Sequence, residues 1–219
     1  MIERKKHPFF IATGCLLLFI LISVLSSFNQ LVNFDQTIIS ALTDGISPLF
    51  LAIMTGITKF GSGEVMLILT VAIGFLLFIR KMWGYAIFLF TLMFGGIALN
   101  FILKILFQRE RPGEMSVIEV FGYSLEIASY SFPSGHTMRS VIFFSFLSYF
   151  CIRIIRNSFA KASVTILFIS MIILVALSRI ITGAHFPSDI LAAGTISIAW
   201  FYFCLLVLRI LFKDKLSIT

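Results

Sequence analysis

The sequence has little charge. Only 12% of its 219 residues are Asp, Glu, Lys or Arg, whereas 59% are hydrophobic and the mean hydropathy is +1.07. A soluble domain of this size carries about twice that share of charged residues, which it needs to cover its surface. The composition therefore excludes an ordinary soluble globular fold and predicts an integral membrane protein whose solvent is mostly lipid.

Linker-like tracts of proline, glycine or serine, internal repeats and low-complexity segments are also lacking. We therefore expect residues 1–219 to form a single membrane-embedded domain. Cysteine is scarce, and Cys15, Cys151 and Cys204 lie in or beside apolar segments at spacings that match no metal motif. We expect neither disulfides nor a zinc site, and interpret the cysteines as small packing residues.

Long hydrophobic runs are what the sequence does have. A bilayer core about 30 Å thick requires roughly 20 apolar residues per helix. The fold class predicted is an all-α bundle of six transmembrane helices, with a short second span, over residues 9–28, 64–79, 83–107, 135–152, 162–181 and 189–212. The segment 34–60 is interrupted by acidic residues, glycine and proline, and we expect it to be amphipathic and either to lie along the interface or to fold back onto the bundle.

The basic residues are divided unevenly between the two sides of this bundle. Six spans place both termini on one side, and that side carries most of the 17 Lys and Arg residues. By the positive-inside rule it is cytoplasmic, which predicts a multi-pass protein of the plasma (inner) membrane. Its basic residues are Arg4, Lys5, Lys6, Arg80, Lys81, Arg153, Arg156, Lys161, Arg209, Lys213 and Lys215.

A smaller set of basic residues falls on the outer side. Several lie inside or at the rim of apolar helices, where a charge costs at least about 2.5 kcal/mol and indicates a functional role. No nucleic-acid partner is expected, because the basic residues do not gather on a soluble face. The outer basic residues are Lys59, Lys104, Arg109, Arg111, Arg139 and Arg179.

The first group of outer polar residues ends the predicted third span. Lys104 and Arg111 are two helical turns apart, so on a continuous helix they share one face about 10 Å apart and can converge on one anion. Pro112 disfavours helix at the residue before it, which predicts that the span ends at Arg111. For Arg109, pairing with Glu110 at the solvated rim is preferred to contact with a substrate head group.

The second group opens the predicted fourth span, where the chain reads Ser131-Phe-Pro133-Ser134-Gly135-His136. Proline, serine and glycine at a helix start leave backbone N–H groups free for an anion, and the positive end of the helix dipole adds to the attraction. Gly135 lets a ligand approach the backbone closely. His136 then lies in the first turn beside the bound anion.

The third group joins the fifth and sixth spans over residues 178–189. Arg179 ends one helix, Gly183 permits a turn, and Asp189 lies in the first turn of the next helix. Asp189 can accept a hydrogen bond from one nitrogen of His185, so that the other nitrogen presents its lone pair. A nucleophile beside an orienting carboxylate is the arrangement found in catalytic triads.

Together these groups match the chemistry of phosphoryl transfer, in which cations and N–H groups neutralise the phosphate oxygens while a nucleophile attacks in line. His185 is predicted to form a phosphohistidine, and His136 to protonate the leaving oxygen. Arg139 is expected to support the site or to anchor the helix at the interface, and these roles are preferred to direct contact with the substrate. Three acidic residues, Glu114, Glu119 and Glu126, are interpreted as a solvated loop, since their irregular spacing fits no metal site.

The three groups fit K-x6-R-P, P-S-G-H and S-R-x5-H-x3-D, and their order resembles the signature of the type 2 phosphatidic acid phosphatase family. Bacterial phosphatidylglycerophosphate phosphatases and undecaprenyl diphosphate phosphatases belong to that family. The resemblance implies a metal-independent phosphatase that acts on a lipid phosphate within the bilayer. We expect no cofactor, and no obligate protein partner is evident from the sequence. The resemblance also implies that His185 is the nucleophile, that Asp189 is its partner, and that the phosphate is held by Lys104, Arg111, Ser134, Gly135, His136 and Arg179.

Undecaprenyl diphosphate is the preferred substrate for an outward-facing site, ahead of phosphatidylglycerophosphate and phosphatidic acid. One alternative is a phosphotransferase that passes the phosphate to another lipid. A second is a non-catalytic lipid-phosphate binder or a transporter, which should place charge near mid-membrane and have paired halves with broken helices. The vanadium haloperoxidases share the signature, but they are soluble.

Overall fold

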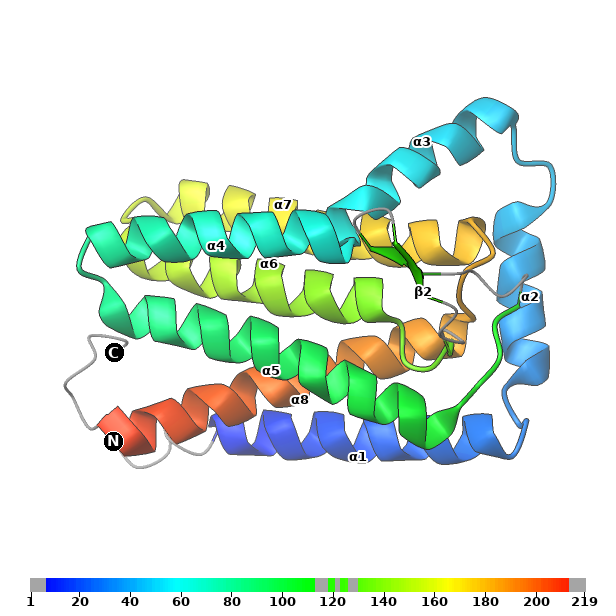
Figure 1. Ribbon diagram of the computed structural model, residues 1–219, viewed down its shortest axis with the longest axis horizontal. Coiled ribbons are helices and arrows are strands. Elements are labelled where there is room, and N and C mark those ends of the chain that lie inside the picture. The colour runs from blue at the N-terminus through cyan, green and yellow to red at the C-terminus, as the bar shows by residue number, and fades with distance from the viewer. Residues whose placement is uncertain (1–6, 113–117, 121–122, 126–129, 213–219) are drawn as a thin grey trace.

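The computed structural model describes residues 7–112, 118–120, 123–125 and 130–212, with side chains described for 7–112 and 130–211. These residues form a bundle of α-helices with one short antiparallel hairpin (Figure 1). The hairpin pairs β1 (Ile118–Val120) with β2 (Tyr123–Leu125). The helices are α1 (His7–Ser27), α2 (Val32–Thr43), α3 (Pro48–Thr58), α4 (Gly63–Ile79), α5 (Trp83–Phe107), α6 (Gly135–Ile154), α7 (Ser158–Ile181) and α8 (Pro187–Phe212), with a 3-10 turn η2 (Lys59–Gly61) after α3.

Five of these helices, α1, α5, α6, α7 and α8, are long and apolar enough to cross a membrane. α4 has 17 residues, a length of about 25 Å at 1.5 Å per residue. It is therefore somewhat shorter than the roughly 30 Å hydrocarbon core, in line with the short second span expected from the sequence. The prediction of a helical membrane protein is confirmed, and the hairpin is a small departure from an all-α fold.

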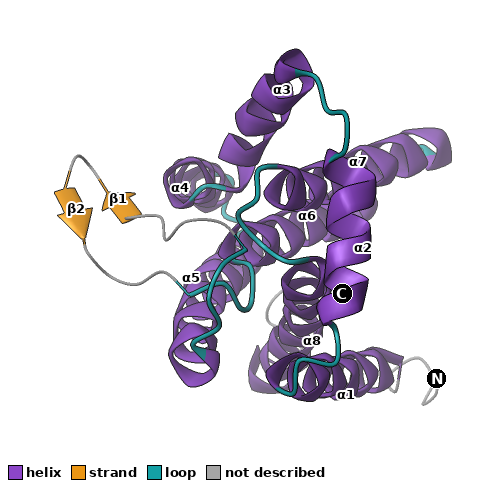
Figure 2. Cartoon of the chain, turned by 90° about the vertical axis from the view of Figure 1, so that its right-hand side faces the viewer, coloured by secondary structure: helices purple, strands orange, loops and turns teal. Residues whose placement is uncertain are grey.

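The chain between α1 and α4 forms two short helices. α2 and α3 meet at an angle of 117°, because Gly45 adopts a left-handed φ of +72° and Pro48 starts a new helix after the N-cap Ser47. Figures 1 and 2 show α2 running across one end of the bundle, over α7 and α8, while α3 packs against α7. Residues 32–61 are called the bent segment below.

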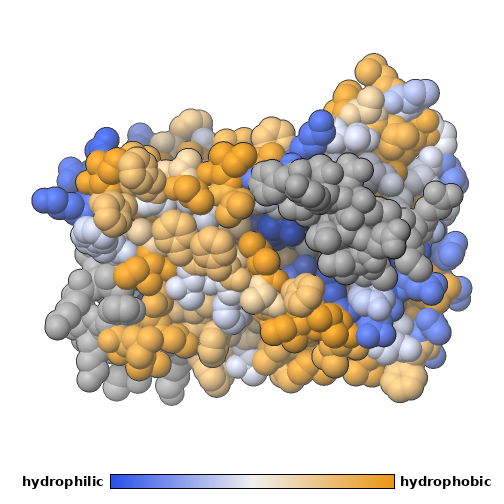
Figure 3. Space-filling view, viewed as in Figure 1, coloured by the Kyte–Doolittle hydropathy of each residue, from blue (hydrophilic) through white to orange (hydrophobic). Residues whose placement is uncertain are grey.

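The outer surface of the bundle is strongly hydrophobic. Large side chains stay exposed along the helices, among them Leu17 on α1, Ile68 on α4 and Ile166 on α7. Figure 3 shows hydrophobic residues across the middle of one face and hydrophilic residues toward its ends. A surface of this kind is stable against acyl chains rather than water.

A buried aromatic cluster supports the end of the bundle where α5 ends and α6 begins. The ring of Phe132 packs edge-on against Phe107 of α5, with centroids 4.9 Å apart, and lies 6.1 Å from Phe19 of α1. Met138 of α6 and Ala192 of α8 pack in the same cluster. This packing fixes the loop that leads into α6.

α5 has the bounds of the third predicted span, but its helix does not continue to Arg111, where Pro112 was expected to end it. Gln108 adopts a left-handed φ of +45°, and its N–H closes the last turn by donating to the carbonyl of Lys104 at 3.0 Å. Lys104 and Arg111 therefore do not share a face of one continuous helix, and that prediction is wrong. Pro112 restricts only the residue before it, whereas the left-handed residue at Gln108 ends the helix first.

Candidate active site

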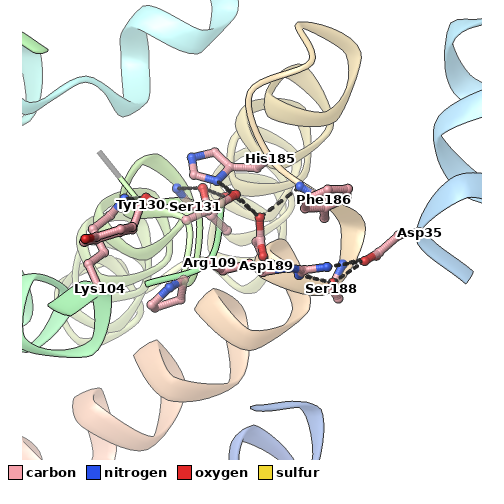
Figure 4. Close-up of polar contacts among 12 residues, drawn as sticks. Asp35, Lys104, Arg109, Tyr130, Ser131, His185, Phe186, Ser188 and Asp189 are labelled. Carbon is pink, nitrogen blue, oxygen red and sulfur yellow. Dashed lines mark hydrogen bonds and ion pairs between the residues drawn. The ribbon is translucent and has the colours of Figure 1, made fainter. Parts of the chain in front are cut away.

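The three sequence groups meet toward one end of the bundle, where α5 and α7 end and α6 and α8 begin (Figure 1). Hydrogen bonds join them in pairs. Lys104 Nζ, near the end of α5, donates to the carbonyl of Tyr130 in the loop before α6. The N–H of Ser134 donates to the carbonyl of Asp189 in α8 at 3.3 Å. These contacts bring together residues that are distant in the sequence. Figure 4 shows Lys104 beside Tyr130.

His185 lies in the turn between α7 and α8. The N–H groups of Ala184 and His185 close this turn by donating to the carbonyl of Arg179 at 3.0 and 3.2 Å, and Gly183 adopts a φ of +68° that favours glycine. His185 is only 1% exposed, and its Nδ1 lies 3.5 Å from Oδ2 of Asp189 in the first turn of α8. The structure thus places these two residues as the histidine–carboxylate pair expected from their spacing.

The environment of His185 determines its protonation. Burial lowers the pKa of His185 to about 4, against the opposing effect of Asp189, so the ring is neutral at pH 7. A carboxylate only accepts hydrogen bonds, so the single ring proton lies on Nδ1, facing Asp189. Nε2, on the other edge of the ring, keeps its lone pair and can act as a nucleophile.

Ser131 joins this pair from the loop before α6. Its hydroxyl donates to Oδ2 of Asp189 and lies 3.2 Å from Nδ1 of His185. The N–H of Phe186 donates to the same carboxylate oxygen at 2.9 Å. The sequence placed Ser131 at the start of the second group without a role, and the structure shows that it helps to hold the carboxylate in place.

The start of α6 lies next to this pair, and the first N–H groups of a helix have no partner within it. Ser134 caps the helix, since its Oγ accepts from the N–H and the hydroxyl of Thr137 at 3.4 and 3.1 Å. Ser134 was predicted to hold phosphate, which stays a prediction. The structure shows that it is also the N-cap of α6. The N–H groups of Gly135 and His136 follow in the first turn, where no helical partner exists and the helix dipole favours an anion.

Gly135 is required for the packing of α6 on α5. A Cβ at this position would lie 2.9 Å from Oδ1 of Asn100 and 3.3 Å from Nη1 of Arg139. Asn100 in turn donates to the carbonyl of Pro133 at 3.1 Å. The sequence did not indicate this reason for a glycine, and the close approach of a phosphate to the backbone stays a prediction.

Cations line the same region. Arg179, 9% exposed, donates from Nη1 to Oγ1 of Thr58 at 2.8 Å. Its Nε is buried without a hydrogen-bond partner among the described residues. A buried unpaired donor costs about 1–3 kcal/mol, so this nitrogen favours a bound anion. Burial also lowers the pKa of Arg111, which marks a guanidinium partly withdrawn from water.

His136 is surrounded by positive charge. The charges of Arg111, Arg139 and Arg179 all act on its ring, and Nη2 of Arg139 lies 3.4 Å from its Nδ1. Arg139 also donates from Nε to the carbonyl of Gly61 at 3.1 Å. Among the roles that the sequence leaves open for Arg139, the contact with His136 fits support of the site. An anion among these cations would be strongly favoured.

Arg109 and Asp35 form a part of the site that the sequence did not indicate. Nη1 of Arg109 lies 2.7 Å from Oδ1 of Asp189, and its Nη2 lies 2.9 Å from Oδ2 of Asp35. The guanidinium also stacks 4.2 Å from the ring centroid of Phe186. The predicted pairing of Arg109 with Glu110 is therefore wrong, because the side chain turns inward toward two carboxylates (Figure 4).

The sequence could have indicated that Asp35 has a partner, but not which residue that partner is. An acidic residue inside a largely apolar helix is costly and indicates a partner, yet Arg109 lies 74 residues further along the chain and Ser188 lies 153 residues away. Sequence spacing cannot reveal contacts at such separations. Thr58 and Gly61, the partners of Arg179 and Arg139, were missed for the same reason.

The acidic loop considered as a metal site cannot be compared with the structure. Glu114 and Glu126 lie outside the described residues, as does the side chain of Glu119. Within the described parts of the chain, no group of three or more His, Cys, Asp or Glu side chains could hold a metal ion. Metal independence stays a prediction.

Comparison with known proteins finds a matching family and related phosphatases. The family model of the PAP2 superfamily matches residues 84–213. Phosphatidylglycerophosphatase B of Bacillus subtilis (strain 168) is 31% identical over 189 residues, which cover 85% of this chain and 89% of that protein. Lipid A 1-phosphatase of Rhizobium johnstonii is 33% identical over 122 residues, 54% of this chain and 45% of that protein.

A solved structure is similar over nearly the whole chain. It is the crystal structure of a transmembrane PAP2-type phosphatidylglycerolphosphate phosphatase from Bacillus subtilis, with a TM-score of 0.78 and 26% identity. The match covers 94% of this chain and 97% of that one.

The fold and the site define a multi-pass helical membrane protein with a buried histidine–carboxylate pair beside clustered cations and a helix N-terminus, a combination suited to a phosphate group. The chain belongs to the PAP2 superfamily. It is a membrane phosphatase, and the family resemblance of its three sequence groups is confirmed.

Proposed function

We propose that this chain hydrolyses the terminal phosphate of a lipid phosphate or diphosphate held in the bilayer, with His185 as the nucleophile. The observation that carries this proposal is the buried, neutral ring of His185, oriented by Asp189 and lying among the charges of Arg111 and Arg179. A hydrophobic exterior around this polar site suits a substrate whose tails stay in lipid.

In the proposed reaction, Nε2 of His185 attacks phosphorus as the bond to the leaving lipid oxygen breaks. The N–H groups at the start of α6 and the cations of Lys104, Arg111 and Arg179 neutralise the phosphate oxygens. Asp189 stabilises the positive charge that the ring of His185 acquires on forming the phosphohistidine.

His136 is proposed to supply the proton to the leaving oxygen. A bound phosphate brings negative charge beside the ring and supports its protonated form. After the dephosphorylated lipid departs, His136 takes a proton from the water that attacks the phosphohistidine. Release of inorganic phosphate then restores the neutral His185.

Two lipids are the leading candidate substrates. Phosphatidylglycerophosphate is supported by the names of the Bacillus subtilis relatives, one of which matches 85% of this chain. Undecaprenyl diphosphate is supported by the expected outward orientation of the site. We rank phosphatidylglycerophosphate first, because the similarity extends over most of both chains.

We further propose that residues 1–219 form one membrane-embedded domain with six spans, α1, α4, α5, α6, α7 and α8. Although α4 is short, it runs alongside α5 and α6 (Figure 1). α2 crosses the end of the bundle, as a helix at the membrane interface would. Basic residues gather at the opposite end, including Arg80, Lys81 and Arg153. The positive-inside rule then makes both termini cytoplasmic and directs the active site outward.

Phosphate release from purified protein in mixed micelles tests the function. The panel is phosphatidylglycerophosphate, undecaprenyl diphosphate and phosphatidic acid, and the variants are His185→Ala and, as a matched control, His7→Ala, which changes an exposed histidine at the start of α1. We expect wild type and His7→Ala to release phosphate and to form an acid-labile phosphoenzyme from a labelled substrate. His185→Ala should do neither.

Undiminished turnover by His185→Ala would refute the proposed nucleophile. A phosphorylated acceptor lipid in place of free phosphate would show a phosphotransferase instead. Binding of the lipid by the wild-type protein without turnover of any panel member would support the non-catalytic alternative.

A further inference from the structure

Asp35 is an unusual residue in the bent segment. It is 1% exposed, and it is the only buried residue of α2, although that helix lies across the end of the bundle. Its Oδ1 accepts the N–H of Ser188 at 2.8 Å, and its Oδ2 accepts the hydroxyl of Ser188 at 2.6 Å and Nη2 of Arg109 at 2.9 Å. Three donors, one of them charged, compensate for burying this carboxylate.

These contacts connect Asp35 to the reacting pair by two short routes. Ser188 directly precedes Asp189, so fixing its N–H and hydroxyl fixes the start of α8. Arg109 bridges the two carboxylates, with Nη2 on Asp35 and Nη1 on Asp189. The other oxygen of Asp189 faces Nδ1 of His185. Asp35 is therefore one side chain removed from the proposed nucleophile pair (Figure 4).

The charges along this route matter as much as the geometry. Asp35, Arg109 and Asp189 together carry one net negative charge behind His185, whose ring becomes positive when it is phosphorylated. If Asp35 were neutral, the charge of Arg109 would cancel that of Asp189. The other charged and titratable groups that act on the ring are Arg179 of α7, Arg111 of the loop after α5 and His136 of α6.

We propose that Asp35 is a positioning residue for phosphate hydrolysis, which acts through Arg109 and Ser188 to keep Asp189 aligned with His185 and negatively charged. This inference rests on the proposed function, because it assumes that His185 is the nucleophile. It assigns a catalytic consequence to the bent segment, which lies outside the three sequence groups.

The test compares Asp35→Asn with Asp44→Asn, the same change at an exposed position just beyond the end of α2. Both proteins are purified in detergent, their folding is checked by thermal unfolding, and rates are normalised to the amount of phosphoenzyme trapped with labelled substrate. For Asp35→Asn we expect kcat to fall roughly ten- to hundredfold with little change in KM. Asp44→Asn should match wild type.

The pH profile separates positioning from folding. Removing a negative charge behind His185 disfavours protonation of the ring, so the acid limb of kcat/KM should move to lower pH in Asp35→Asn. A purely structural role would lower the yield of folded protein but leave kcat and the acid limb of the remaining enzyme unchanged. That result would overturn the inference.

A double-mutant cycle tests the route through Arg109. If Asp35 acts through Arg109, then Asp35→Asn should cost much less activity in an Arg109→Gln background than in wild type, and multiplicative losses would contradict the route. Should Asp35→Asn fail to fold, Ser188→Ala removes one donor to Asp35 without changing charge. It should lower kcat severalfold, and an unchanged kcat would refute the inference.

The proposed function and the role of Asp35 can be refuted separately. Phosphate release by wild type that does not depend on His185 would refute the proposed function. Release that depends on His185, together with wild-type kcat in Asp35→Asn, would refute only the role of Asp35.

Discussion

Nη1 of Arg109 lies 2.7 Å from one oxygen of Asp189, while His185 faces the other oxygen of the same carboxylate. Asp189 is thus held between a permanent cation and a ring that is proposed to become cationic only during the reaction. Arg109 does not occupy the arginine position of the K-x6-R-P pattern, which belongs to Arg111. Its contact nevertheless places it at the centre of the site.

Arg109→Gln should lower kcat/KM roughly ten- to hundredfold, because hydrogen bonds to charged groups contribute about 1.5–3 kcal/mol and a buried carboxylate would lose its partner. The comparison is Arg156→Gln, which alters an exposed arginine at the other end of the bundle. Steady-state rates on a lipid phosphate in mixed micelles provide the measurement. Equal rates for the two variants would show that Arg109 has no part in catalysis.

The acid limb of activity should lie near pH 4, well below the ordinary value for histidine of about 6.5. His185 must be neutral to attack, and burial lowers its pKa to about 4. Activity should therefore persist as the pH falls through 6 and disappear as it passes through about 4. The measurement is kcat/KM against pH, corrected for titration of the substrate followed by phosphorus NMR. A corrected limb near pH 6.5 would contradict the assignment.

Gly135→Ala should destabilise the protein by about 1–3 kcal/mol and reduce activity, since the new methyl group would press against Oδ1 of Asn100. Gly194→Ala in α8 is a matched control, because nothing lies within 4 Å of a Cβ there, and alanine favours helix. Thermal unfolding in detergent measures both. Shortening the opposing side chain in Gly135→Ala/Asn100→Ala should recover part of the lost stability, and no recovery would argue against this contact.

Activity should survive strong chelators and be inhibited by vanadate, which adopts the five-coordinate geometry of phosphorus in transfer. The proposed mechanism uses only side chains and backbone N–H groups. Rates after dialysis against chelator, with and without added divalent ions, test this expectation. Complete loss that metal restores would direct attention to Glu114, Glu119 and Glu126.

Much of the architecture could be predicted from the sequence, because lipid imposes a simple rule on helix length and composition. The third predicted span coincides with α5, and the fourth begins at Gly135 as predicted. The further expectation that helix continues to Arg111 was wrong, because proline was taken as the helix terminator. The left-handed conformation of Gln108 depends on local packing that composition does not reveal.

The site could be predicted only where its partners are close in sequence. His185 and Asp189 are four residues apart, on either side of the start of α8, so their pairing could be expected from the sequence. Arg109 pairs with Asp35 instead of its neighbour Glu110, and this choice depends on how the bent segment folds over the bundle. Contacts of that kind are formed by the tertiary structure, and they cannot be predicted from the spacing of residues in a single sequence.

The bent segment holds the active-site arginines at both of its ends, through Asp35 near its start and through Thr58 and Gly61 near its finish. Order in this segment and order in the anion site are therefore linked, and the linkage must be reciprocal. An inhibitor that engages the arginines should slow amide hydrogen exchange throughout α2 and α3, including residues it never touches. Conversely, a molecule that binds the bent segment from the membrane surface should change the affinity of the site for phosphate without entering it.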